Sequence, residues 1–238
     1  VFEIAPKINA AGRISQGKAA VELMVSDNLK QAHQIVNDII TLNDSRREMD
    51  MSSTTEALLQ VETSGQIPNF STVVYGPTWN KGVIVASRLT ESFYKPTVVF
   101  ADGNNGELVA SARSVSDFDV HDALDRCSHF FTKFGGHPAA AGLSMEKDQF
   151  EALKEHFEKV VAEKIQEHQK YPSIKIDSIV GIDDLNKDFF NFHRKLAPFG
   201  PHNMKPILVL KNQKVSGYVK TMGKEGNHLK FFIKQEST

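Results

Sequence analysis

The longest helical pattern of hydrophobic positions lies in residues 27–65. Its apolar residues recur three or four positions apart, which is the period of one helix face. They are Ala32, Ile35, Val36, Ile39 and Ile40. Asp27 is a suitable N-cap for this helix, and Gly65 with Pro68 ends it. The second half of the segment is more polar, so we predict a partly solvated helix that connects two domains.

Residues 66–170 alternate short β-branched runs with amphipathic patterns, which is typical of an α/β domain. The predicted strands are 71–75, 97–101 and 107–113, with an Asn- and Gly-rich turn at 102–106. The predicted helices are 82–93, 118–131 and 150–165, and a Gly-Gly-His turn is predicted within 134–144. Together these elements predict a mixed sheet with flanking helices.

Tyr171-Pro172 breaks this pattern and marks the predicted domain boundary. The remaining chain is rich in short alternating runs. Its predicted strands are 174–180, 207–210, 215–219 and 229–233, with one short helix at 185–194. Because these strands are few for a closed barrel, we predict a partial β-rich domain in residues 171–238.

Charge is distributed unevenly along the chain. The net charge of the 238 residues is −1, which does not by itself indicate a nucleic-acid partner. The segment 205–234, however, holds seven lysines and one acid, Glu225, a net charge of +6. This asymmetry indicates a surface that faces a polyanion, with Lys214, Tyr218, Lys220 and Lys230 as candidate nucleic-acid contacts. The alternative is an ordinary solvated face of strands and loops.

Cysteine content and hydropathy indicate the cellular compartment of the protein. The single Cys127 excludes an intrachain disulfide and fits the reducing cytoplasm. No apolar run approaches the roughly 20 residues that cross a bilayer. The amino-terminal sequence lacks a signal-peptide pattern and an initiator Met, so we expect a cytoplasmic fragment or a processed chain.

Two motifs of the α/β region have residue types that bind phosphate. Ser111 and Arg113 end a predicted strand two residues apart, so alternation places both on one face. A hydroxyl beside a guanidinium fork suits a phosphate, although Arg113 could instead pair with Asp117 or Asp119. Further on, Gly135-Gly136-His137 could present converging backbone N–H groups and an imidazole to an anion. The alternative is a tight turn that leads into the buried Ala139–Gly142 run.

Two other motifs are compatible with either a functional or a structural role. Arg13 follows the small-residue loop Asn9–Gly12, where the backbone could approach a substrate and the guanidinium could bind its phosphate; the loop could equally pack on its own domain. The Asp119-x-His121-Asp122 pattern could suggest a metal site. It lies where a helix begins, however, and aspartate is common at an N-cap. We therefore predict no metal ligands and no catalytic residues in this chain.

The order of these motifs resembles the RecJ nucleases of the DHH/DHHA1 phosphoesterase family. The segment Ala5–Arg13 is similar to the family's junction with its catalytic DHH domain. The motifs around Ser111–Ser114, Phe118–Leu124 and Phe134–Gly142 are similar to the DHHA1 domain, and Leu196–Gly200 resembles the start of the OB-type domain. The resemblance implies a junction in 1–26, a connector helix in 27–65, a DHHA1 substrate-binding domain in 66–170 and a partial OB-like nucleic-acid-binding domain in 171–238.

The resemblance also implies a function. The intact protein would be a single-stranded-DNA-specific 5′→3′ exonuclease of DNA repair and recombination, with two Mn²⁺ or Mg²⁺ ions in the DHH domain. Phosphate contacts of this family correspond to Ser111, Arg113, Gly135, Gly136 and His137 in this sequence, and Arg13 is a further candidate because of the loop that precedes it. No Asp-His-His triplet occurs in the chain, so it should hold no cofactor and be inactive alone. The implied partners are single-stranded DNA, a RecQ-type helicase and a single-strand-binding protein.

Two alternatives belong to other functional classes. One is a DHH/DHHA1 phosphodiesterase of short oligoribonucleotides or cyclic dinucleotides, which shares the Gly-Gly-His motif but normally ends soon after it. The other is a non-catalytic, RNA-binding DHHA1 module. The lysine-rich, β-rich segment after residue 171 argues against the first. The Ser111-Ala112-Arg113 motif and the Leu196–Gly200 segment argue against the second.

Overall fold

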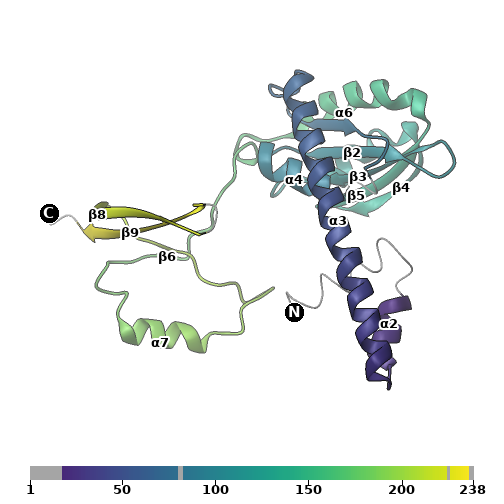
Figure 1. Ribbon diagram of the computed structural model, residues 1–238. Helices are drawn as coiled ribbons and strands as arrows, with labels where there is room; N and C mark the ends of the chain where they lie inside the picture. Colours follow the sequence, from purple (N-terminus) through teal and green to yellow (C-terminus); the bar gives the residue numbers. More distant parts are fainter. Residues whose placement is uncertain (1–17, 80–82, 224–225, 236–238) are drawn as a thin grey trace. The chain divides into compact units, whose positions relative to one another are not determined.

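A computed structural model describes residues 18–79, 83–223 and 226–235, without the side chains of Arg46, Val83 and Gln235 (Figure 1). The chain divides into two compact units, residues 1–172 and 173–238. Arg13 and the rest of the predicted junction up to residue 17 lie outside the described residues. Among the described residues, no helix combines the length and the apolar character that crossing a membrane requires.

A long helix opens the first unit. After the short helix α2 (Lys18–Val25), helix α3 (Leu29–Thr63) runs for 35 residues, which confirms the predicted connector helix. Its N-cap is Asn28 rather than the predicted Asp27. The Asn28 side chain accepts hydrogen bonds from the backbone N–H groups of Lys30 and Gln31, at 3.0 and 3.2 Å. Asn28 therefore satisfies two of the amide donors that a helix leaves unpaired at its start.

The centre of the first unit is a mixed five-stranded sheet of order β1-β2-β3-β5-β4, as the fold class predicted. Its strands are β1 (Thr72–Tyr75), β2 (Thr97–Asp102), β3 (Leu108–Arg113), β4 (Phe131–His137) and β5 (Ala140–Met145). Strand β1 runs parallel to β2, and the other neighbours are antiparallel. Strand β4 therefore forms one edge of the sheet.

Helices cover the two faces of this sheet unequally. On one face, α5 (Val120–Asp125) and α6 (Phe150–Lys164) bury a continuous apolar cluster that includes Phe100, Leu108 and Leu143. On the other face, α3 and α4 (Val83–Phe93) pack on β1 and β2 through residues such as Val74 and Val99. The part of this second face formed by β3, β5 and β4 contributes no residue to the apolar cluster under α3 and α4.

Helix α5 is shorter than the predicted 118–131 helix. It ends at Asp125, and a 3-10 turn, η1 (Ser128–Phe130), follows before β4. Tighter backbone bonds replace the α-helical ones: Cys127 N–H donates to Leu124 and Phe130 N–H to Cys127. This turn places Cys127 fully in the core. Tertiary packing thus ends a helix whose local sequence pattern continues.

The second unit holds two small sheets and one helix. Strand β6 (Ser178–Ile179) pairs in parallel with β7 (Leu208–Val209), α7 spans Lys187–Lys195, and β8 (Gln213–Met222) forms an antiparallel hairpin with β9 (His228–Gln235). The predicted 174–180 strand is mostly wrong, since only Ser178–Ile179 is strand. Backbone pairing reaches only one residue further on each side: the Asp177 N–H donates to the Ile207 carbonyl oxygen at 2.9 Å and the Val180 N–H to that of Val209 at 3.0 Å. The Asp177 side chain also accepts the Ile207 N–H at 2.8 Å. None of the described residues of this unit is fully buried.

Candidate nucleic-acid-binding surfaces

Ser111 and Arg113 lie on the less covered face of the sheet. Both belong to β3, and strand alternation puts their side chains on the same side. On β2, Ser111 is opposite Val99, which packs beneath α3 and α4. Residues directly opposite in a sheet point to the same face, so Ser111 and Arg113 share the α4 side. Both side chains are partly exposed.

Strands β5 and β4 continue this face and bring two further predicted residues to it. Cross-strand pairing forms two rows, each of which runs from β3 through β5 to β4. The first row is Ser111, Gly142 and Gly135, and the second row is Arg113, Ala140 and His137. Four of the predicted phosphate contacts therefore lie on one face together with Gly142. We name these five residues the open face: Ser111, Arg113, Gly135, His137 and Gly142.

Two glycines leave the middle of the open face without side chains. Gly135 and Gly142 are exposed, and a Cβ on Gly135 would meet no heavy atom within 4 Å. At Gly142 the nearest atom to such a Cβ is the Ala110 carbonyl oxygen at 3.8 Å. An extended ligand could thus approach the backbone here, with Arg113 and His137 on the adjacent row.

The predicted Gly-Gly-His turn is wrong. Gly135 and Gly136 are extended residues of β4, and the turn that follows is Pro138-Ala139. Neither glycine has the positive φ of an anion nest. Gly136 pairs with Ala141 and lies on the opposite face from Gly135. A Cβ on Gly136 would lie 2.5 Å from the Ala140 carbonyl oxygen and the Ala141 Cα, so packing requires glycine at this position.

Hydrogen bonds orient the two charged or ionisable groups of the open face. Arg113 Nη1 donates to the Ala112 carbonyl oxygen at 2.7 Å. The exposed His137 ring accepts the Ala139 N–H at Nδ1, at 3.3 Å. In the neutral tautomer that fits this bond, the proton is on Nε2, which can donate to a phosphate oxygen.

The Asp119-x-His121-Asp122 pattern has a structural role, as its position at a helix start predicted. The Asp119 side chain caps α5 by accepting the Asp122 N–H at 2.9 Å. Asp122 forms an ion pair with Lys164 of α6, and the His121 ring stacks on Phe134 at 4.7 Å between centroids. In the described part of the chain, no group of three or more His, Cys, Asp or Glu residues could hold a metal ion.

A second candidate surface is the β8–β9 hairpin of the carboxyl-terminal unit. Its pairing sets lysine opposite lysine twice, Lys214 with Lys234 and Lys220 with Lys230. Alternation along β9 places Lys230 and Lys234 on the same face, with Phe232 between them. We name these five residues the lysine face. Like charges directly opposite each other destabilise a sheet, and a bound polyanion would relieve that repulsion.

Aromatic side chains accompany these lysines. Phe232 is 67% exposed, and Tyr218 is 83% exposed in a β-bulge where Gly217 takes a φ of +73°. Exposed rings of this kind are sites on which unpaired bases stack. Three predicted contacts, Lys214, Lys220 and Lys230, are thus brought together. Lys234 lies within the predicted 205–234 surface but is not singled out by the sequence, and Gly142 is not among the predicted contacts. The two-residue period of β9 could have found Lys234, but the partner of Gly142 is visible only in the sheet.

Two family models match the chain in the same order as these surfaces. The DHHA1 domain matches residues 69–163, which include the open face, and the RecJ OB domain matches residues 176–238, which include the lysine face. The chain belongs to the RecJ family. RecJ membership confirms the resemblance that the motif order indicated.

Proteins similar to this chain in sequence and structure agree with this assignment. The single-stranded-DNA-specific exonuclease RecJ of Bacillus subtilis is 32% identical over 240 residues, which cover 100% of this chain and 30% of that relative. RecJ of Escherichia coli is 31% identical over 87% of this chain and 37% of its own length. The crystal structure of RecJ in complex with Mg²⁺ from Thermus thermophilus superposes on 98% of this chain with a TM-score of 0.83 and 26% identity, and 36% of that structure is covered. The chain therefore spans about a third of the length of its RecJ relatives.

Proposed function

We propose that this chain is the substrate-binding portion of a single-stranded-DNA-specific 5′→3′ exonuclease. The observation that carries the proposal is that this RecJ-family chain has two surfaces suited to bind anions, one in each matched domain. The open face of the DHHA1 domain joins Arg113, His137 and Ser111 beside two glycines. The lysine face of the OB domain adds opposed lysines and exposed rings.

The two surfaces would perform different parts of one task. On the open face, the Arg113 fork and the His137 Nε2–H would donate to a phosphate, while Gly135 and Gly142 let the sugar–phosphate backbone lie against the sheet. The lysine face would hold the strand by charge and by base stacking, largely without regard to sequence. Both contacts bind and orient the strand, and neither needs to change covalently.

Hydrolysis is assigned to a part of the intact protein outside these surfaces. There, two Mn²⁺ or Mg²⁺ ions held by aspartates and histidines of a DHH domain would activate the attacking water. The related Thermus thermophilus RecJ structures are described as complexes with Mg²⁺ and with Mn²⁺, which supports this choice of ions. The proposed setting is cytoplasmic DNA repair and recombination, in which a RecQ-type helicase and a single-strand-binding protein would supply and hold the unwound strand.

The RecJ OB match supports a DNA exonuclease over a phosphodiesterase of short oligoribonucleotides or cyclic dinucleotides. A substrate of two or three nucleotides would be held by the open face alone. A domain of 63 matched residues with a lysine face is useful only for a longer strand. The RecJ OB match also favours the proposal over a non-catalytic, RNA-binding DHHA1 module.

Binding of single-stranded DNA by the lysine face should depend steeply on salt. The logarithm of the affinity should fall with the logarithm of salt concentration by about 0.7 per phosphate contacted. Changing Lys220 and Lys230 to glutamine should therefore reduce this slope by about 1.4, as measured by fluorescence anisotropy with a labelled oligothymidine. Lys175→Gln, an exposed lysine of the same unit outside the hairpin, is the matched control. An unchanged slope in the double variant would remove the lysine face from the binding site.

The isolated chain should bind DNA without degrading it. The reason is that its sequence has no Asp-His-His triplet and the proposed ions belong to another domain. The test is incubation of the purified chain with 5′-labelled single-stranded DNA and Mn²⁺, followed by gel analysis, with a mock preparation as the control for contaminating nucleases. Processive 5′ degradation above that control would contradict the assignment of hydrolysis to the DHH domain.

A further inference from the structure

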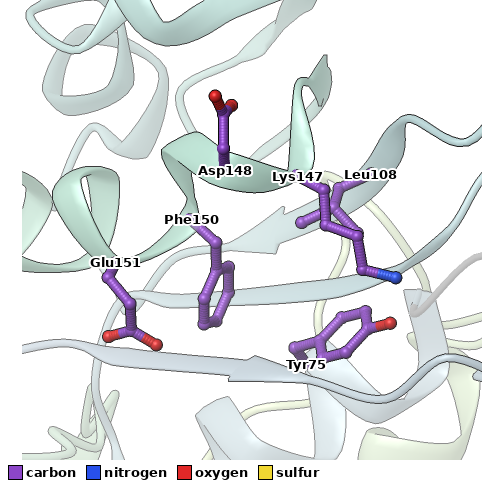
Figure 2. A pocket seen from close by; sticks show the side chains of 6 residues that line it. All are labelled: Tyr75, Leu108, Lys147, Asp148, Phe150 and Glu151. Atoms are coloured by element: carbon purple, nitrogen blue, oxygen red, sulfur yellow. The ribbon is translucent and has the colours of Figure 1, made fainter.

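A small cavity lies on the other face of the sheet, between the end of β1 and the start of α6 (Figure 2). Its volume is about 260 Å³, and its lining residues are Tyr75, Leu108, Lys147, Asp148, Phe150 and Glu151. Leu108 belongs to the core beneath α5 and α6, whereas Ser111 on the same strand faces the α4 side. The cavity is thus separate from the open face.

Two aromatic rings, Tyr75 and Phe150, line this cavity. The Phe150 ring meets Phe100 edge to face, with centroids 5.3 Å apart and an interplanar angle of 89°. It is also 5.9 Å from the Tyr75 ring. Because Phe100 is fully buried, these contacts hold Phe150 in place. The cavity therefore presents ring surfaces that pack against the apolar core.

Lys147 shows which chemistry this site favours. Its ammonium lies 5.2 Å from the Tyr75 ring centroid and 3.0 Å from Asp102 Oδ1. The Tyr75 hydroxyl donates to the same carboxylate oxygen at 2.7 Å. The hydrogen bonds from Tyr75 and Lys147 lower the pKa of the exposed Asp102 carboxyl below its usual value. A ring and a carboxylate thus hold one cation at the edge of the cavity.

A second ring–carboxylate pair lies beside the first. Figure 2 shows the Glu151 carboxylate on the same side of α6 as the Phe150 ring, while Asp148 points away from the rings. Among the ion pairs of the described residues, none uses Asp148 or Glu151. Asp102 is already paired with Lys147, so Glu151 is the carboxylate on the ring side that none of these ion pairs uses. Its negative charge favours a cation and disfavours a phosphate.

We propose that this cavity binds an arginine side chain from a basic segment of a partner protein. A guanidinium can stack on the Phe150 ring and donate to the Glu151 carboxylate, which repeats the arrangement of Lys147 with Tyr75 and Asp102. The cavity is below the roughly 300 Å³ at which small-molecule sites begin, so it suits one side chain. It is a protein-docking site on the sheet face opposite to the open face.

The test uses the full 238-residue chain and two blocked hexapeptides of glycine and serine. One peptide contains a single arginine, and the other contains citrulline, which keeps the shape and removes the charge. Binding is followed by the NMR signals of the Leu108 methyl groups and the Tyr75 and Phe150 rings. The arginine peptide should bind at least about fivefold more tightly than the citrulline peptide, and added salt should weaken its binding.

Two variants locate the contact. Glu151→Gln and Phe150→Leu should each weaken the arginine peptide by about two- to fivefold, whereas Glu163→Gln, an exposed position near the end of the same helix, should not. Glu151→Gln keeps the test decisive if Phe150→Leu lowers stability. Equal affinity for the two peptides, wild-type affinity in Glu151→Gln, or shifts at these signals caused by oligothymidine instead of the arginine peptide would overturn the proposal.

Discussion

If the intact protein is the proposed exonuclease, changing Arg113 to alanine should reduce its kcat/KM on single-stranded DNA by about 10- to 100-fold. A charge-assisted hydrogen bond from arginine to phosphate contributes roughly 1.5–3 kcal/mol, and each factor of ten corresponds to about 1.4 kcal/mol. Arg113 shares the open face with His137 and Ser111, so its loss removes the main positive charge that the proposal assigns to the phosphate. Initial rates on 5′-labelled oligonucleotides measure the effect.

The controls for this prediction separate binding from folding. Arg126→Ala removes an exposed arginine at the end of α5 and should leave kcat/KM unchanged. Arg113→Lys keeps the charge but loses the planar guanidinium, so its kcat/KM should be intermediate between those of wild type and Arg113→Ala. The unfolding temperature of each variant shows whether the Arg113–Ala112 hydrogen bond matters for stability. If Arg113→Ala has the wild-type kcat/KM, Arg113 does not bind the substrate phosphate and its role is structural only.

The local pattern of apolar residues correctly predicted the helices and strands that have a regular apolar face. Helices α4 and α6 and strands β1, β2 and β3 lie within a residue or two of their predicted limits, because each has a regular apolar face that the core accepts. One failure is local: Asn28 replaces Asp27 as N-cap, a shift of one residue, through its own bonds to Lys30 and Gln31. The other involves the core: α5 ends at Asp125, and Cys127 is buried in the turn that follows.

The open face shows the limit of local patterns at a site. Sequence placed Ser111 and Arg113 on one face, since alternation is a local rule. It could not place Gly135 opposite Gly142, because that pairing depends on the register between two strands. For the same reason the Gly-Gly-His motif was predicted as a turn, although the chain reverses one residue later, at Pro138-Ala139. The residue types were informative, and their mutual positions required the sheet.

The adjacent glycines of β4 should respond oppositely to the same substitution. Gly136→Ala should destabilise the chain by roughly 3 kcal/mol, because its Cβ would meet the Ala140 carbonyl oxygen and the Ala141 Cα at 2.5 Å. Gly135→Ala should keep or slightly raise stability, because its Cβ meets no heavy atom within 4 Å and alanine has less conformational freedom to lose in a strand. Denaturant unfolding of the two variants measures both effects.

The effect on DNA binding should be the reverse of the effect on stability: the more stable variant, Gly135→Ala, should be the one whose folded form binds DNA less tightly. In Gly135→Ala the new methyl group projects from the open face, in the row next to Arg113 and His137, where the proposal places the sugar–phosphate backbone. Its affinity for single-stranded DNA should therefore fall although the protein remains fully folded. In Gly136→Ala the methyl group points to the core side, so any loss of affinity should follow the fraction unfolded. A Gly135→Ala variant that binds as tightly as wild type would exclude close approach of the strand at the glycines, and a Gly136→Ala variant of unchanged stability would contradict the β4–β5 register on which the open face depends.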